Sequence, residues 1–411
     1  MSALHSLQQK MAAFGPGILM ATAAIGGSHL VSSTQAGALF GSQLIWLIVL
    51  VNVIKYPFFK FAVAYTCEQQ KTVVEGYYQH YRFGFKVFVL LNSFAAIVNT
   101  AGVVLLTASL LSYSLPLSIN IEWLSLTLLV LCLSMLLIGH YKLLDLTSKW
   151  VMLILTLATL AALVIAMING PAHAPPANPV SPFDIALLGF LVALMGWMPA
   201  PIEISAINSA WLKTKMVKAK LTSGQIMLDF KVGYFVTVAL AVVFVVLGML
   251  MQYGQNKPIE LAGIAFSQQL IDMYANTIGE WSRWLIAAVA VLCMFGTTIT
   301  VLDGYARVLS EAVKLLKPQR NTNPYTAIVL LQATLGLLLV LFFKADLKSM
   351  LMFAMTSAFV TTPIFAAMNL GLVRGALFQK QTWAVKLLTY IGLFYLFGFA
   401  LGYLYWQFIY R

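Results

Sequence analysis

A polar cluster interrupts an apolar stretch near the start of the chain. The stretch from residue 21 to residue 35 is apolar enough to cross a membrane, yet at mid-span it carries Gly26, Gly27, Ser28, His29 and Ser32. Paired glycines beside polar side chains predict a break in the helix. Backbone that leaves helical geometry inside hydrocarbon is tolerated only where protein or a water-lined cavity receives its N–H and C=O groups. The sequence therefore predicts that something polar binds at this break.

A second interruption lies about halfway along the chain. Residues 195–203 read Met-Gly-Trp-Met-Pro-Ala-Pro-Ile-Glu, so Trp197, Met198 and Ala200 fall at the break and Glu203 follows it. Paired interruptions at corresponding places in two halves of a membrane protein indicate the binding site of a transporter. The alternative is a pair of Gly/Pro kinks, which are common in membrane helices.

The composition sets the class of protein. Hydrophobic residues make up 61% of the chain and charged residues 9%, whereas a soluble domain has about 45–50% and about 25%. This composition predicts a polytopic helical membrane protein. The formal net charge of +12 comes from basic residues in loops between apolar segments, so we expect no nucleic-acid partner. Cys67, Cys132 and Cys293 have no paired spacing, which indicates neither a disulfide framework nor a metal cluster.

Eleven segments are long and apolar enough to span a bilayer, for which about 20 residues suffice. They are residues 13–39, 43–67, 85–114, 121–139, 147–169, 183–212, 230–253, 282–312, 325–343, 347–371 and 383–409. Basic residues gather in alternate loops, such as Lys213, Lys215, Lys218 and Lys220, and basic loops stay cytoplasmic. We therefore expect a bacterial inner (plasma) membrane protein with its N-terminus in the cytoplasm and its C-terminus outside. The longest outer connection is expected to hold a surface helix around residues 259–274.

Two inverted halves of five spans account for ten of these segments, because a second half that follows five spans starts from the opposite side of the membrane. This topology places the site-forming helices first and sixth, and the two breaks occupy those positions. The expected division is a first repeat over residues 1–170, a second repeat over residues 171–375 and an extra C-terminal helix over residues 376–411.

Several motifs carry a resemblance to a known family. Residues 15–19 (Gly-Pro-Gly-Ile-Leu), 25–29 (Ile-Gly-Gly-Ser-His) and 35–41 (Gln-Ala-Gly-Ala-Leu-Phe-Gly) resemble the first helix of the NRAMP family of divalent-metal transporters. Met198-Pro199 resembles that family's sixth-helix break, and residues 296–300 (Gly-Thr-Thr-Ile-Thr) resemble its hydroxyl-rich eighth helix. The resemblance implies the LeuT-type fold of the APC superfamily, an inverted repeat plus one extra helix, with alternating access around a site between helices one and six.

The chain differs from the family at the positions that would bind metal. Where the family's first helix carries Asp-Pro-Gly-Asn, this chain has Gly-Gly-Ser-His over residues 26–29. The sixth-helix motif Ala-x-x-Met-Pro-His is replaced by Met-Gly-Trp-Met-Pro-Ala over residues 195–200, which keeps the thioether and lacks the histidine. The third helix, acidic in the family, has no acid over residues 96–102. The resemblance therefore implies a divergent branch without the metal-binding motif.

Without a carboxylate, the first break presents hydrogen-bond donors. The outer half of helix one begins near Ser28 and the inner half of helix six begins near Pro201, so both aim their positive N-termini at the midplane. We therefore expect a secondary transporter of a small inorganic ion, with bicarbonate favoured over nitrate, formate and similar anions. The expected substrate-binding residues are Gly26, Gly27, Ser28, His29, Ser32, Trp197, Met198 and Ala200.

Two alternatives stay open. The first is a Mn²⁺/Mg²⁺ transporter of the NRAMP type, in which His29, Met198 and Glu203 bind the metal. The second is a sensor or scaffold with the same fold that does not transport. We expect no enzymatic activity, because the sequence offers no nucleophile–base pair, and we expect no cofactor and no obligate protein partner beyond the substrate ion and the lipid bilayer.

An anion that accumulates against an inside-negative potential needs a driving cation, because moving one charge costs about 2.3 kcal/mol per 100 mV. Thr297 and Thr298, with the carbonyls of Ala24 and Ile25, resemble the sodium site of several LeuT-type transporters. Na⁺ is therefore a candidate coupling ion, and H⁺ is the other. The alternative is that the threonine hydroxyls only bond the carbonyls four residues before them.

Ionisable residues within the spans are functional candidates. Glu203 can couple protons, form an inner gate with Lys60 or Arg307, or stabilise a helix dipole. Asp303 and Arg307 are four residues apart on the predicted eighth helix, a spacing that lets their charges pair.

Overall fold

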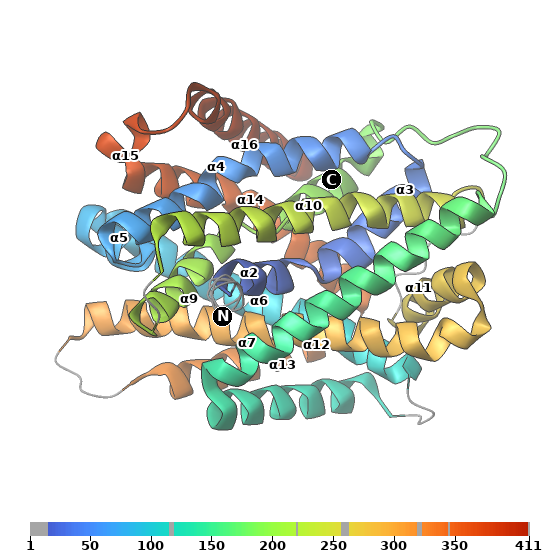
Figure 1. Cartoon of the computed structure of the whole chain (residues 1–411), viewed down its shortest axis with the longest axis horizontal. Coiled ribbons are helices and arrows are strands. Elements are labelled where there is room, and N and C mark those ends of the chain that lie inside the picture. Colours follow the sequence, from blue (N-terminus) through green and yellow to red (C-terminus); the bar gives the residue numbers. More distant parts are fainter. Residues whose placement is uncertain are drawn as a thin grey trace, which may run out of the picture.

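The computed structural model describes residues 15–114, 119–218, 221–255, 263–318, 323–343 and 346–409. In these ranges every regular element is a helix and no strand occurs (Figure 1). The predicted all-α polytopic fold is therefore confirmed. Residues 13, 14 and 256–262, parts of two predicted segments, and Lys220 lie outside the described ranges.

The first predicted span is a broken helix. Helix α2 runs over Pro16–Ala24, a bend follows at residues 25–26, and a π-helical segment over Ser28–Ser33 leads into α3, Thr34–Phe40. The break falls at the paired glycines, as the sequence predicts.

The sixth predicted span is broken as well. A short 3₁₀ turn, Ile185–Leu187, leads into α8, Leu188–Trp197, and α9 resumes at Ile204 and ends at Lys218. The non-helical segment contains Pro199 and Pro201, which have no backbone N–H to continue a helix. The Met198–Pro199 peptide bond is cis.

The remaining helices have no such break. They are α4 (Ile45–Gln69), α5 (Val73–His80), α6 (Arg82–Ser114), α7 (Ile121–Asn169), α10 (Ser223–Gln252), α11 (Gly263–Ile278), α12 (Arg283–Leu316), α13 (Tyr325–Phe342), α14 (Leu347–Val373), α15 (Ala376–Gln379) and α16 (Trp383–Ile409). Figure 1 shows α7 as two arms that meet in a sharp bend. The expected surface helix is present as α11.

Eight helices in the described ranges are long and apolar enough to cross a membrane. The other three predicted spans are the two broken helices and the second arm of α7, of which Leu153–Asn169 is described as an apolar helix. The chain is thus an integral membrane protein. Helices α5 and α15 lie at one end of the bundle and α3 and α11 at the other (Figure 1).

The broken first helix lies inside the bundle, where α2 contacts α7, α9, α10 and α12. Its packing against α10 depends on small residues. A Cβ atom on Gly17 would lie 2.3 Å from the Asp229 carbonyl oxygen, and one on Gly248 would lie 2.1 Å from that of Thr34. Glycine at these positions therefore lets the two helices approach each other closely. Asp229 also accepts hydrogen bonds from the Gly15 and Gly17 amides (3.2 and 2.8 Å), which holds the start of α2.

Candidate functional site

A small cavity lies where the two helix breaks meet. Its volume is about 30 Å³, so it admits a solute of only a few atoms. Its polar lining comes from four helices and consists of Gly27, Ser28, Asn99, Trp197, Thr297 and Tyr305, and the remaining lining residues, such as Ala23, Ala24 and Pro201, are apolar. None of the lining side chains carries a formal charge at neutral pH. Five of the residues predicted for the site are therefore brought together here: Ala24, Gly27, Ser28, Trp197 and Thr297.

The paired glycines let neighbouring helices approach the first break. A Cβ atom on Gly26 would lie 2.7 Å from Thr297 Oγ1 of α12, and one on Gly27 would lie 2.6 Å from a ring carbon of Trp197 of α8. No larger residue fits at either position unless its neighbour moves. The lack of a side chain at Gly26 and Gly27 thus permits close packing, and it also means that neither position carries a carboxylate.

Backbone donors at the first break are only partly used. The Gly26 amide donates to the Ala24 carbonyl (3.1 Å), and the Gly26 carbonyl accepts from the amides of His29 (3.1 Å) and Leu30 (2.9 Å). The amides of Gly27 and Ser28 donate to no backbone carbonyl within the described ranges. First-turn N–H groups of this kind are the donors that a helix end offers to an anion.

Side chains from the second break, α6 and α12 add further donors. The buried Trp197 Nε1–H has no hydrogen-bond partner among the described residues. Asn99 Nδ2 donates to the Tyr305 hydroxyl (2.9 Å), which donates to Glu203 Oε1 (3.2 Å). The sequence prediction omits Asn99 and Tyr305. Their only signal is a polar atom in an apolar span, and many such residues are structural.

His29 and Ser32 point away from the cavity. His29 Nε2 must donate to the Thr237 carbonyl of α10 (2.8 Å), because a carbonyl only accepts, and Nδ1 lies 2.6 Å from Ser28 Oγ. The Ser32 hydroxyl donates to Met355 Sδ of α14 (3.0 Å). Both side chains are thus engaged in packing the broken helix against its neighbours.

Met198 and Ala200 are buried but do not line the cavity. The Ser33 hydroxyl donates to Met198 Sδ at 3.9 Å. The alternative metal-ligand set therefore does not converge on the cavity, because neither His29 nor Met198 nor Glu203 lines it. Among the described residues, no group of three or more His, Cys, Asp or Glu side chains is placed to hold a metal ion.

The two threonines predicted for the coupling site face different helices. Thr297 Oγ1 lies near the carbonyl oxygens of Thr22 (3.1 Å) and Ile25 (3.4 Å) at the first break. Thr298 Oγ1 instead lies 2.9 Å from Thr107 Oγ1 of α6. Each hydroxyl also bonds the carbonyl four residues before it. Thr297 therefore belongs to the first break, whereas Thr298 joins α12 to α6.

Lys55 is a further functional candidate, because ionisable residues inside membrane spans are rare. This residue of α4 has a relative exposure of 0%. Its ammonium group donates to the carbonyls of Met195 (2.6 Å), Gly196 (3.0 Å) and Ala200 (3.4 Å) at the second break. Lys60, the predicted gate partner of Glu203, donates instead to Gln381 Oε1 (2.7 Å).

Asp303 and Arg307 form the predicted pair, with Arg307 Nη2 2.6 Å from Asp303 Oδ1. The Asp303 carboxylate also accepts hydrogen bonds from Trp211 Nε1 of α9 (2.8 Å) and the Tyr325 hydroxyl of α13 (2.9 Å). Since Asp303 has a relative exposure of 2%, this network joins α9, α12 and α13. Neither residue contacts Glu203 in the described network, so the geometry favours a structural role over a gate for the pair.

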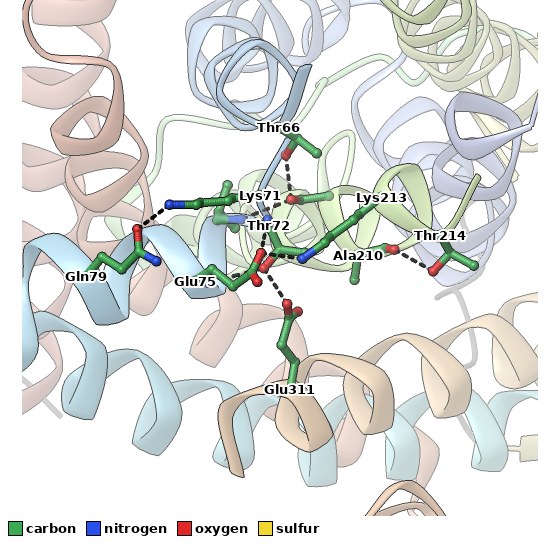
Figure 2. Close-up of polar contacts among 11 residues, drawn as sticks. Thr66, Lys71, Thr72, Glu75, Gln79, Ala210, Lys213, Thr214 and Glu311 are labelled. Atoms are coloured by element: carbon green, nitrogen blue, oxygen red, sulfur yellow. Dashed lines mark hydrogen bonds and ion pairs between the residues drawn. The ribbon is translucent and has the colours of Figure 1, made fainter. Parts of the chain in front are cut away.

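A polar cluster joins α9 to the start of α5, as Figure 2 shows. Lys213 Nζ donates to Glu75 Oε2 (2.6 Å), and the Thr72 hydroxyl donates to Glu311 Oε1 of α12 (2.8 Å). Ser209 Oγ accepts from the Val73 amide (3.0 Å). We call the side chains of Thr72, Glu75, Ser209, Lys213 and Glu311 the α5 latch. A second cavity of about 610 Å³ lies beside the α5 latch.

Comparison with known proteins agrees with this architecture. No family model matches the chain. It is 46% identical over 400 residues to an uncharacterized protein of Pasteurella multocida (strain Pm70), a match that covers 95% of this chain and 92% of that one.

Solved transporters share the fold at low sequence identity. A manganese transporter of Eremococcus coleocola superposes with a TM-score of 0.70 at 14% identity, covering 96% of this chain and 86% of that chain. A nucleobase-cation-symport-1 family transporter, in a closed conformation with bromovinylhydantoin bound, superposes with a TM-score of 0.61 at 14% identity, covering 96% and 92%. The chain has the LeuT-type fold of these transporters and belongs to the family of the uncharacterized Pasteurella protein.

Proposed function

We propose that this protein is a secondary active transporter of a small anion, with bicarbonate the best candidate. The observation that carries the proposal is the cavity between the two breaks, whose lining offers amide and indole donors and no carboxylate. The amides of Gly27 and Ser28 and the indole N–H of Trp197 are available to an acceptor. Bicarbonate is small and planar, and it both donates and accepts hydrogen bonds.

The charges around the second break support the same sign of substrate. A helix C-terminus is negative and attracts cations, but the end of α8 already binds the Lys55 ammonium. The N-terminus that begins at Ser28 is left to act on a solute. A divalent metal would need oxygen or imidazole ligands and charge neutralisation, and the lining supplies no anionic group for this.

Coupling to Na⁺ is the preferred mode of energising the transport. The Thr297 hydroxyl and the carbonyls of Thr22 and Ile25 converge at the first break, and neutral oxygens of this kind are suitable ligands for Na⁺. A proton is less suitable for bicarbonate, because the two together are equivalent to CO₂ and water, which cross lipid unaided.

Uptake of labelled bicarbonate into proteoliposomes that contain the full chain tests the proposal. At alkaline pH, where little CO₂ is present, we expect saturable uptake that rises with an inward Na⁺ gradient and is absent from protein-free liposomes. Saturable manganese uptake without any bicarbonate uptake would falsify the proposal and favour the NRAMP-type alternative, which the shared fold with a manganese transporter keeps open.

We expect α9 to move relative to α5 during alternating access. The α5 latch should therefore control opening at the end of the bundle where α5 lies. A partly exposed ion pair contributes up to about 1 kcal/mol, which corresponds to about a fivefold change in an equilibrium. In an Ala206→Cys background, where the native side chain is 1% exposed, Lys213→Met should raise the rate of thiol labelling about fivefold.

Lys380→Met is the matched control for this prediction, since the Lys380–Glu68 pair (3.0 Å) is exposed and does not involve α9. It should leave the labelling rate unchanged. Equal labelling of the Lys213→Met, Lys380→Met and parent proteins would show that the α5 latch does not restrain α9.

A further inference from the structure

The Lys55 ammonium occupies a cage of carbonyl oxygens inside the bundle. Lysine is almost never fully buried unless it is paired, and an ammonium group has three N–H donors. The three acceptors are the carbonyls of Met195, Gly196 and Ala200, at 2.6, 3.0 and 3.4 Å. Two of them belong to the last turn of α8, where carbonyls lack intrahelical donors. The cage is therefore a site for a cation, and a side chain of this protein fills it.

A buried carboxylate completes the surroundings of the cage. Glu203, 1% exposed, lies at the far side of the second break and attracts the Lys55 charge electrostatically. Glu203 Oε1 accepts a hydrogen bond from the Tyr305 hydroxyl, and Oε2 has no partner among the described residues. Without Lys55, the second break would hold three carbonyl oxygens and one uncompensated carboxylate, which are ligands suited to a free cation.

We propose that Lys55 is a tethered cation that fills a cation site at the second break, so that free cations cannot bind there and the transported solute is an anion. This inference rests on the proposed function, because it names the residue that sets the sign of the substrate. The cage without Lys55 binds small cations: ammonium and methylammonium ions, which reproduce the tip of the lysine, and Mn²⁺.

Thermal unfolding of the purified full chain in detergent tests the tethered cation. Lys55→Ala should lower the Tm, because it leaves the three carbonyls and Glu203 without their cation. Methylammonium chloride should restore part of the lost Tm, whereas tetramethylammonium chloride at the same ionic strength should not, because it is too large for the cage. Lys386→Ala is the matched control, since Lys386 donates to the Gln379 carbonyl (2.9 Å) at the surface.

Several results would overturn the inference. These are an unchanged Tm for Lys55→Ala, an equal response to methylammonium and tetramethylammonium, and a response to methylammonium in Lys386→Ala as large as that in Lys55→Ala. If Lys55→Ala does not fold, the double variant Lys55→Ala/Glu203→Gln decides. It lacks the uncompensated carboxylate and should fold, and its failure to fold would mean that charge compensation is not the role of Lys55.

A calorimetric titration with Mn²⁺ separates this inference from the proposed function. We expect no manganese binding to the wild type at millimolar concentrations and at least a tenfold gain in affinity in Lys55→Ala. If methylammonium restores the Tm of Lys55→Ala but the wild type takes up no bicarbonate, only the proposed function is refuted. Bicarbonate uptake by the wild type, with neither rescue nor manganese binding in Lys55→Ala, would refute the tethered cation alone.

Discussion

Gly26→Asp is expected to reduce bicarbonate uptake on the order of 100-fold or more, because it places a fixed negative charge beside the anion cavity. Two like charges about 4 Å apart repel by about 4 kcal/mol at the effective dielectric of a protein, and each 1.4 kcal/mol is a tenfold change in affinity. The new side chain also meets Thr297, whose Oγ1 would lie 2.7 Å from the added Cβ. The measurement is labelled uptake into proteoliposomes.

Gly26→Asn separates charge from shape in this experiment. Asparagine has nearly the same volume as aspartate and makes the same contact with Thr297, but it carries no charge. We expect Gly26→Asn to lose less uptake than Gly26→Asp by at least about tenfold, a difference of 1.4 kcal/mol. Equal losses in the two variants would mean that Gly26 serves packing alone.

Asp303→Ala is expected to lower the free energy of unfolding by about 3–5 kcal/mol, the cost of breaking a buried ion pair by removing one partner. It leaves the Trp211 indole N–H, the Tyr325 hydroxyl and the Arg307 guanidinium without their shared acceptor. The readout is unfolding in detergent. Asp303→Asn should lower the free energy of unfolding by less, because its amide oxygen still accepts a hydrogen bond.

Asp346→Ala is the control for Asp303→Ala. The Asp346 carboxylate caps the start of α14 at the surface, where it accepts from the Ser349 amide (3.1 Å). Loss of such a cap costs about 1 kcal/mol. A similar, small destabilisation in both variants would show that the Asp303 network does not hold α9, α12 and α13 together.

The architecture is readable in the sequence because its signals are local. Paired glycines and paired prolines in apolar segments predict the two breaks. Glycine has no side chain to restrict the backbone, and proline has no N–H to continue a helix, so each acts on the few residues around it. Helix α7 shows the limit of such local signals. The sequence predicts two separate spans over residues 121–139 and 147–169, but α7 runs as one helix over Ile121–Asn169.

The site is readable only in part, because its contacts join distant segments. The sequence selects Gly27, Ser28, Trp197 and Thr297, which do line the cavity. It cannot show that His29 turns toward Thr237, which lies 208 residues away. Nor can it distinguish a lysine that reaches the membrane surface from Lys55, whose acceptors are 140 residues or more along the chain.

Two experimental structures of the wild-type protein, one prepared with bicarbonate and one with Mn²⁺ and recorded with anomalous data, identify the solute at the helix breaks. We expect density for a small planar solute beside Gly27, Ser28 and Asn99 in the first structure, and no anomalous manganese signal at either helix break in the second. A manganese peak among those residues, or at Met198, would contradict this expectation.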